Sequence, residues 1–164
     1  MNTLNLENIT NQAPYQITLV EEEPCIFYFQ TDYEVEYEIV IKSNDLFIPS
    51  GAYALDIINI WGKTSPGDTK FRQTLMAIIE EFFRQNNEVL LYVTETEDKK
   101  QAFRNRLFIR WFNTYEHHDR YIIKTAEGKM KGQTNFLAII MRKDNPQREQ
   151  AIKEFEETIE FLFD

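Results

Sequence analysis

Apolar and acidic residues alternate between residues 33 and 41, and no other pattern in the chain constrains the fold as strongly. The apolar set is Tyr33, Val35, Tyr37, Ile39 and Ile41, and the residues between them include Glu34, Glu36 and Glu38. Successive side chains of a β-strand point to opposite faces, so this period predicts a strand with one buried face and one open acidic face. The three carboxylates lie about 7 Å apart along such a strand, which favours a solvated face over a metal site.

The flanking segments predict an antiparallel sheet interrupted by helices. Strands are expected at residues 15–20, 25–31, 52–61, 88–94, 120–126 and 135–142, with turns at 31–32 and 127–134. Helical spacing of apolar residues predicts helices over 71–83, over 98–113 and after Asn145-Pro146. The fold class is therefore α+β: a mostly antiparallel sheet of six to seven strands with three helices, in the order β-β-β-β-α-β-α-β-β-α. We expect one domain over residues 1–164, with an irregular N-terminal segment at 1–14.

Two helix starts carry capping signals. Ser65 or Thr69 is the expected N-cap of the first helix, and Asp98 with Gln101 forms a capping box for the second. The second helix is expected to bury Phe103, Leu107, Phe108 and Trp111 and to expose Lys99, Lys100, Arg104, Arg106 and Arg110.

Charge is divided unevenly along the chain, whose net charge is −9. Residues 1–60 hold ten acidic residues and one basic residue, whereas residues 99–131 hold nine basic and three acidic residues. The basic stretch either complements the acidic strands, within the chain or across a homodimer, or forms a groove for a phosphate-bearing ligand. The acidic balance of the whole chain argues against a nucleic-acid partner.

Cysteine usage and hydropathy indicate a cytoplasmic protein without a membrane segment. Cys25 is the only cysteine, so no intrachain disulfide can form. It opens the apolar run 25–29 and follows Glu21, Glu22 and Glu23, which predicts a buried thiol with a raised pKa. No apolar run approaches the roughly 18 residues of a membrane span, and the first ten residues do not resemble a signal peptide.

The element order over about residues 25–142 is similar to the second half of the GNAT acyltransferase fold. In that family the loop before the first of these helices reads R/Q-x-x-G-x-G/A, and its backbone N–H groups hold the pyrophosphate of acyl-CoA. The corresponding stretch here is Thr64-Ser65-Pro66-Gly67-Asp68-Thr69, in which only Gly67 matches. The positions nearest to the family's tyrosine acid hold Asn105 and Arg106. The resemblance implies acetyl-CoA or CoA as a ligand, and these departures count against acetyl transfer.

A second resemblance is to a bacterial family known only as a domain of unknown function, DUF6169. It is carried by residues 71–83, by Val89-Leu90-Leu91-Tyr92, and by the segment 98–112, DKKQAFRNRLFIRWF. This resemblance implies a shared fold and supplies no activity.

Other short motifs do not complete a catalytic or metal site. His117-His118-Asp119 is the only histidine cluster, and adjacent histidines of a strand point to opposite faces, so we expect a polar loop and no metal. The chain has no G-x-S-x-G, no phosphate-binding G-x-x-x-x-G-K-[ST] and no G-x-G-x-x-G.

Two functional hypotheses remain open, and the residues do not decide whether the chain is an enzyme. The first is a non-enzymatic binding or interaction module without a cofactor, with a homodimer or another protein as partner. The alternative is a diverged acyl-CoA-dependent N-acyltransferase. The candidate ligand-binding residues are Ser65, Gly67, Asp68, Thr69, Arg104, Arg106 and Arg110.

Overall fold

The computed structural model describes residues 1–95 and 99–163, and at residues 95, 99 and 100 it describes the backbone alone. Its elements are α1 (Leu6–Gln12), β1 (Thr18–Glu22), β2 (Cys25–Gln30), β3 (Glu36–Ser43), β4 (Ala52–Asn59), α2 (Thr69–Gln85), β5 (Val89–Glu95), α3 (Lys99–Thr114), the 3-10 turn η1 (His118–Arg120), β6 (Tyr121–Met130), β7 (Gln133–Arg142) and α4 (Arg148–Leu162). The strand order is β1-β2-β3-β4-β5-β7-β6. The predicted α+β class and the seven strands are confirmed, although strand ends shift by up to four residues. In the described ranges no helix is long and apolar enough to cross a bilayer.

The chain divides into two compact units. The N-terminal unit comprises Met1–Ser43 and Leu55–Asn87, and the C-terminal unit comprises Asn44–Ala54 and Glu88–Asp164. Strand β4 is therefore shared: its first three residues belong to the C-terminal unit, where they pair in parallel with residues 89–91 of β5.

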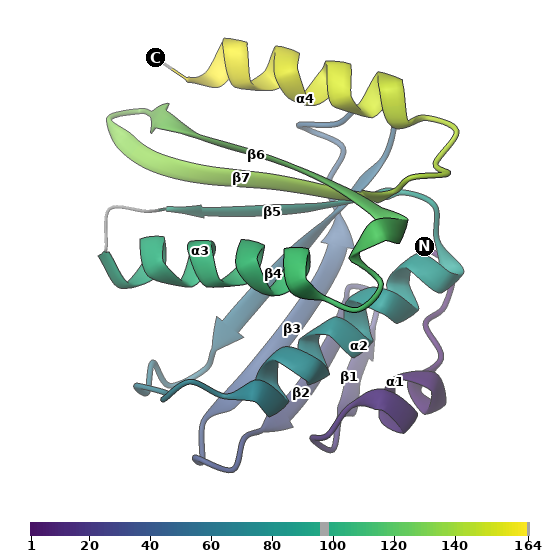
Figure 1. Cartoon of the computed structure of the whole chain (residues 1–164), viewed down its shortest axis with the longest axis vertical. Helices are drawn as coiled ribbons and strands as arrows, with labels where there is room; N and C mark the ends of the chain where they lie inside the picture. Colours follow the sequence, from purple (N-terminus) through teal and green to yellow (C-terminus); the bar gives the residue numbers. More distant parts are fainter. Residues whose placement is uncertain (96–98, 164) are drawn as a thin grey trace. The chain divides into compact units, whose positions relative to one another are not determined.

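The N-terminal unit is built on the antiparallel meander β1-β2-β3, which α2 crosses (Figure 1). In β2 the residues Cys25, Phe27 and Phe29 are buried and alternate with half-buried ones, as expected for a strand with one core face. The ring of Phe71 on α2 lies 5.8 Å from that of Phe29 and 4.6 Å from that of Tyr37. Aromatic packing of this kind is a large part of what holds the helix on the sheet.

The burial that the alternation predicts is found in β3 only in part, because Val40 is buried as well as both of its neighbours. Val35, Ile39 and Ile41 are buried, but Tyr33 is 51% exposed, so its predicted place in the core is wrong. The hydroxyl of Thr31 accepts hydrogen bonds from the amides of Tyr33 and Val35. This local side-chain bonding stabilises a loop in place of strand pairing, and Glu34 within it takes a φ of 59°. The connection predicted as a short turn at residues 31–32 is therefore a longer loop, which ends where β3 begins at Glu36.

The prediction of an irregular segment at residues 1–14 is wrong, because α1 lies within it. This helix has seven residues, and Asn5 caps it by accepting a hydrogen bond from the amide of Asn8. A helix this short is not stable alone in water, so tertiary contacts must hold it. Ile9 is fully buried, and the side chain of Asn8 bonds to Glu81 on α2. The described residues consequently contain four α-helices where the sequence predicted three.

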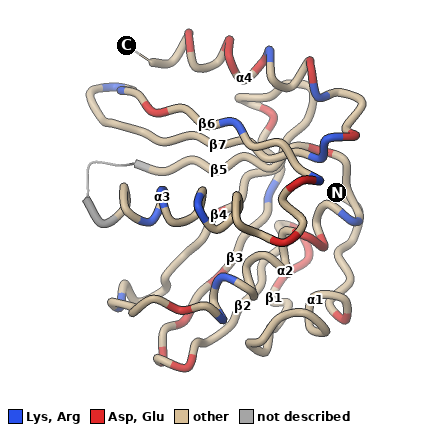
Figure 2. Tube along the Cα trace, in the orientation of Figure 1, with Lys and Arg blue, Asp and Glu red and all other residues tan. Residues whose placement is uncertain are grey.

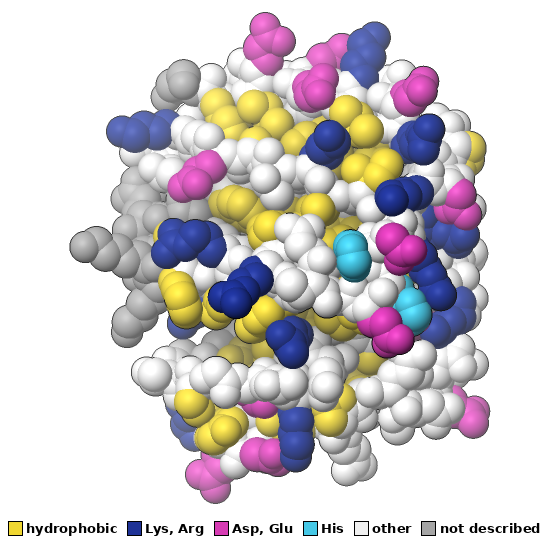
Figure 3. Space-filling model, in the orientation of Figure 1, with side chains coloured by type: hydrophobic (Ala, Val, Ile, Leu, Met, Phe, Trp, Pro, Cys, Tyr) yellow, Lys and Arg dark blue, Asp and Glu magenta, His cyan; other side chains and the backbone are white. Residues whose placement is uncertain are grey.

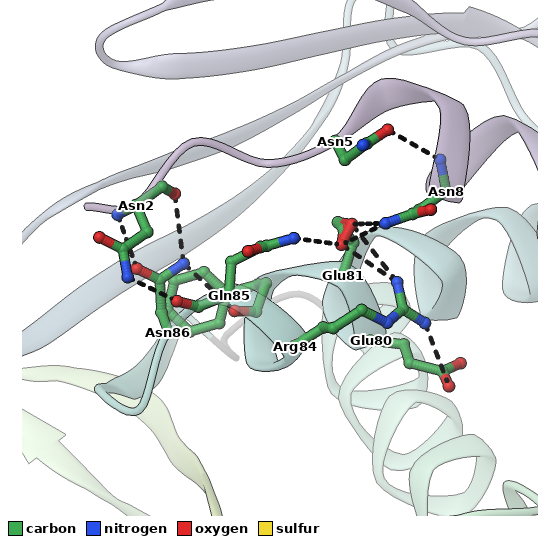
Figure 4. A network of polar contacts seen from close by, with 9 residues as sticks. Asn2, Asn5, Asn8, Glu80, Glu81, Arg84, Gln85 and Asn86 are labelled. Carbon is green, nitrogen blue, oxygen red and sulfur yellow. Dashed lines mark hydrogen bonds and ion pairs between the residues drawn. The ribbon is translucent and has the colours of Figure 1, made fainter.

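Figure 4 shows the polar network through which α1 and α2 meet. Glu81 is fully buried, and its carboxylate accepts hydrogen bonds from Asn8, from Arg84 at 3.1 Å and from Gln85 at 3.2 Å. A buried carboxylate is costly unless it is paired and hydrogen bonded, and here it has both kinds of partner. The burial of the Glu81 carboxylate is therefore explained by these contacts between α1 and α2, without a ligand.

The C-terminal unit has three layers, with α4 on one face of the strands β5, β7 and β6 and α3 on the other (Figure 1). The α4 side holds a cluster of fully apolar contacts that includes Leu91, Leu137, Ile139 and Phe155. On the α3 side, the rings of Tyr92 and Phe108 stack with centroids 4.8 Å apart. The prediction that β5 is buried on both faces is confirmed, because its residues 89–92 are all buried.

Strands β6 and β7 form a long hairpin closed by two residues, Lys131 and Gly132. Both have positive φ, 53° and 80°, which suits the right-handed twist of a two-residue hairpin turn. The predicted eight-residue turn at 127–134 is therefore wrong, because residues 127–130 pair with 133–136. The last helix begins at Arg148, and Asn145 accepts a hydrogen bond from the amide of Gln147 before it.

Replacing Asn8 tests the contact between α1 and α2. Asn8→Ala should lower the free energy of unfolding by about 1–3 kcal/mol, because the buried Glu81 carboxylate loses a donor. Urea unfolding followed by circular dichroism measures this change. Asn11→Ala is the matched control, since Asn11 is exposed on the same helix and gains the same helix propensity. Equal unfolding midpoints for the two variants would contradict the role of the network.

Candidate functional site

The loop before α2, which holds three of the predicted ligand residues, ends in a side-chain cap, and a fourth, Thr69, begins the helix. Asp68 is the N-cap of α2, and its Oδ1 accepts a hydrogen bond from the amide of Lys70 at 3.0 Å. Ser65 instead donates to the carbonyl of Pro66 at 3.2 Å, and Thr69 is the first helical residue. The predictions that Ser65 or Thr69 caps the helix are wrong, because Asp68 stands one residue before the first turn with an extended backbone.

A tyrosine fixes the Asp68 carboxylate from its other side. The hydroxyl of Tyr15 donates to Asp68 Oδ2 at 2.5 Å and accepts from the amide of Asp32 at 3.2 Å. Burial and the hydrogen bond to Asp68 raise the pKa of Tyr15 to about 12, so it stays a neutral donor at physiological pH. Lys70 in turn forms an ion pair with Asp32 at 2.7 Å.

This arrangement decides what the N-terminus of α2 can bind. The amide of Lys70 and the positive end of the helix already face a carboxylate that belongs to the chain. An incoming pyrophosphate would meet Asp68 at short range and be repelled. Gly67 has open space around it, with nothing within 4 Å of the position a Cβ would take, and offers no cradle.

The remaining predicted residues lie on α3, in the C-terminal unit. Arg104, Arg106 and Arg110 are exposed, and the described positions along α3 include no acidic residue (Figure 2). Arg104 donates to Gln101 at 3.4 Å. The ion pairs within this unit join Arg142 to Asp144 and Lys153 to Glu157. Among the described residues of this unit, therefore, the three arginines form no ion pair.

The face that α3 buries differs from the predicted one. Phe108 is buried as predicted, but Phe103 is 56% exposed, and the core-facing stripe continues instead through Asn105 and Phe112. Five residues turn an α-helix by about 500°, which is one full turn and about 140° more. Phe103 therefore lies on nearly the opposite side of α3 from Phe108. The predicted capping box at Asp98 lies outside the described residues.

A groove runs along α3 on the side of the β6-β7 hairpin, and we call it the α3 groove. It has a volume of about 470 Å³. Seven residues of α3 line it, at spacings of three and four between Ala102 and Thr114, together with Glu127 of β6 and Phe136 of β7. Figure 3 shows basic side chains over α3 with hydrophobic side chains beside them. The groove thus joins an apolar wall to a basic border, and of the predicted residues it contains Arg106 and Arg110 but not Arg104.

Asn105 lines this groove and is the polar residue that the prediction of ligand sites missed. It is 2% exposed, and its Oδ1 accepts hydrogen bonds from Thr94 at 3.0 Å, Gln101 at 3.1 Å and Tyr92 at 3.3 Å. Its Nδ2 has no hydrogen-bond partner among the described residues. The sequence signal was that Asn105 stands one turn before Phe108 and so shares its face of the helix. The prediction placed Phe103 on that face, and Asn105 was therefore not selected.

The polar groups that line the groove include several hydrogen-bond donors. Its charged lining residues are Arg106, Arg110 and Glu127, and the hydroxyl of Thr114 donates to the carbonyl of Arg110 at 2.8 Å. Arginine and amide N–H groups are donors suited to a carboxylate or a phosphate.

One glutamate of the alternating segment, Glu36, is held by hydrogen bonds to its carboxylate. Glu36 accepts from the Tyr28 hydroxyl at 2.5 Å and from the indole N–H of Trp61. These two hydrogen bonds hold the pKa of Glu36 below its usual value. Glu34 lies in the loop before the strand, so the prediction of three carboxylates on one strand face is wrong.

Cysteine and histidine do not add a reactive centre. Cys25 is buried, and burial together with the charge of Glu22 raises the pKa of its thiol to about 11, which confirms the prediction. His118 Nδ1 lies 2.7 Å from the carbonyl of Tyr115 in the polar turn η1. The described parts of the chain hold no group of three or more residues suited to a metal ion.

Comparison with known proteins matches the sequence of the chain to a protein family. A family model described as a family of unknown function, DUF6169, matches residues 67–157, which is more than half of the chain. The three segments that carry the resemblance to this family, between residues 71 and 112, all lie inside the match. No curated protein and no solved structure matches the chain.

Replacing Asp68 tests the assignment of the α2 N-terminus to capping. Asp68→Ala should lower the free energy of unfolding by about 0.5–2 kcal/mol, since the first turn of α2 loses its cap and Tyr15 loses its acceptor. Chemical unfolding measures the difference. Thr69→Ala, at the exposed neighbouring position, should change it by less than about 0.5 kcal/mol. An equal loss in both variants would contradict the N-cap assignment.

Proposed function

We propose that this chain, which belongs to the DUF6169 family, is a non-enzymatic binding module whose ligand site is the α3 groove. One observation carries the proposal: Asn105 lines the groove, and its buried Nδ2 group has no hydrogen-bond partner among the described residues. An unpaired buried donor costs about 1–3 kcal/mol, and folded proteins leave few of them. A ligand that accepts a hydrogen bond from Nδ2 would remove this cost.

The border of the groove supports an anionic ligand. Arg106 and Arg110 stand one helical turn apart, so both guanidinium groups can reach the same bound group. Neither forms an ion pair with a described residue of its unit. Hydrogen bonds between arginine and an anion are among the stronger polar contacts in proteins. The volume of about 470 Å³ falls in the usual range of roughly 300–1,000 Å³ for small-molecule sites.

The proposal also includes a cytoplasmic location and a homodimer. The single buried cysteine supports a reducing compartment, where disulfides do not form. The acidic first sixty residues and the basic stretch 99–131 support association between two copies of the chain.

A diverged acyl-CoA-dependent N-acyltransferase on a GNAT-like scaffold is the second candidate. The element order supports it, since a strand meander, a helix, a further strand, a helix and a closing hairpin occur in the order of that fold. The Asp68 cap weighs against it, because a carboxylate stands where the pyrophosphate of CoA would bind.

Titration with CoA separates the two candidates. We expect CoA and acetyl-CoA to leave the melting temperature unchanged, with ATP as a polyanion control. A ligand at 100 times its Kd stabilises a fold by about 2.7 kcal/mol, which is a shift of several degrees for a chain of this size. A rise with CoA and none with ATP would support the acyltransferase and contradict the binding module.

A fluorescent anion tests the groove directly. The probe 8-anilinonaphthalene-1-sulfonate combines an apolar body with one negative charge, and its emission rises on transfer to an apolar site. We expect the folded protein to bind it and the double variant Arg106→Ala, Arg110→Ala to bind it at least about 10-fold more weakly, since two charge-assisted contacts are lost.

Arg104→Ala is the matched control for this measurement. It removes one arginine from the same helix, where the double variant removes two, and Arg104 does not line the groove. The Kd of this variant should stay within about twofold of the unaltered protein. An equal loss in Arg104→Ala, or no loss in the double variant, would overturn the assignment of the site.

A further inference from the structure

We infer that the Asn105 carboxamide is the specificity-determining group of the α3 groove, and that the groove takes a small carboxylic acid with an apolar body. The inference rests on the proposed function and names the chemical class of its ligand. Its starting point is the unequal pairing of the two polar atoms of Asn105, one with three donors and the other without an acceptor among the described residues.

The Gln101 amide fixes the orientation of the carboxamide. Oδ1 accepts from three donors: the hydroxyls of Tyr92 and Thr94 on β5, and the Gln101 amide one turn earlier on α3. The hydroxyls could also accept from a rotated amide, but the Gln101 nitrogen can only donate, so rotation would set two donors against each other. Since oxygen and nitrogen lie on opposite sides of the planar group, Nδ2 is directed away from these donors, and its two N–H groups have no acceptor among the described residues.

The other donors that line the groove favour a ligand that accepts hydrogen bonds. The Arg106 and Arg110 guanidinium groups can only donate hydrogen bonds, and so can Nδ2. A ligand that satisfies them must present oxygen atoms without hydrogens, as an ionised carboxylate or a phosphate does. A hydroxyl or an amine would bring hydrogens to a site that already has a surplus of donors.

Two features favour the carboxylate over the phosphate. Glu127 also lines the groove, and its negative charge opposes a phosphate dianion more strongly than a carboxylate with one charge. The apolar lining residues Ala102, Ile109 and Phe136 supply a wall that rewards an apolar body next to the acid. Phe136 is 8% exposed and is held in the T-shaped contact with Tyr92, so this wall is preformed.

The experiment compares three probes that share one apolar body: naphthalene-2-carboxylate, naphthalene-2-carboxamide and 2-naphthyl phosphate. Isothermal titration of the full chain should give a Kd for the carboxylate at least about 10-fold lower than for either of the others, since a single charge-assisted hydrogen bond can contribute that factor. This series needs no variant and so does not depend on the folding of one.

The variant Asn105→Asp tests the residue itself. It keeps an oxygen for the three donors and replaces the N–H groups by a second carboxylate oxygen, so it should weaken carboxylate binding at least about 10-fold. Gln147→Glu is the matched control, because it adds the same charge at an exposed position of the same unit that does not line the groove. That control should lose less than about threefold, since exposed charges interact weakly.

The outcomes separate this inference from the function on which it rests. Equal affinity for the carboxamide, tighter binding of the phosphate, or equal losses in the two variants would overturn the carboxylate assignment. If the anilinonaphthalene sulfonate binds in an arginine-dependent way but no naphthalene compound does, the inference fails and the groove remains a binding site. If neither kind of probe binds, the proposed function fails with it.

Discussion

Burial of β5 and β7 on both faces is the constraint on which the C-terminal unit depends. Residues 137–141 of β7 are all fully buried, and residues 89–92 of β5 nearly so. Two such strands need cover on each side, because their backbone groups pair within the sheet and their apolar side chains must leave water on both faces. Helix α4 covers one face with apolar contacts throughout. Helix α3 covers the other with Phe108 and Phe112, and along its flank it leaves the groove.

Most of the buried polar groups described above are paired, but two side-chain atoms among the described residues are not: Asn59 Oδ1 in the N-terminal unit and Asn105 Nδ2 in the C-terminal unit. In the N-terminal unit the Glu81 carboxylate receives donors from three side chains, and the Asp68 carboxylate is shared between Tyr15 and the start of α2. Both are explained by the stability they give. In the C-terminal unit Asn105 is satisfied at its oxygen and not at its nitrogen within the described chain. Because Asn105 also lines the α3 groove, its unpaired nitrogen supports the proposal of recognition there, since stability alone would favour a paired amide or an apolar side chain.

The same reasoning explains why α2 and α3 differ as ligand sites although the sequence offered both. A helix N-terminus attracts anions through its free amides and dipole, and α2 meets that demand from within the chain through Asp68. Helix α3 offers charge along its side, where Arg106 and Arg110 flank an apolar groove and no described acid of the unit pairs with them. Two arginines of the basic stretch therefore lie beside the α3 groove. The glycine-bearing segment 64–69 instead leads into α2 and supplies its N-cap, Asp68.

The sequence by itself determined the class of the fold, its strand order along the chain and the isolated, buried state of Cys25, because these follow from short-range periodicity and composition. Periodicity also located α3, but it did not decide which of several apolar residues face the core, and so Phe103 was chosen and Asn105 passed over. Tertiary structure decided α1, which has too few residues to be stable without Glu81 and its buried neighbours. It also decided the Asp68 cap, since the partner that fixes that carboxylate, Tyr15, lies 53 residues away in sequence. The groove depends on tertiary structure for the same physical reason: its lining comes from α3, β6 and β7, and only folding brings these segments together.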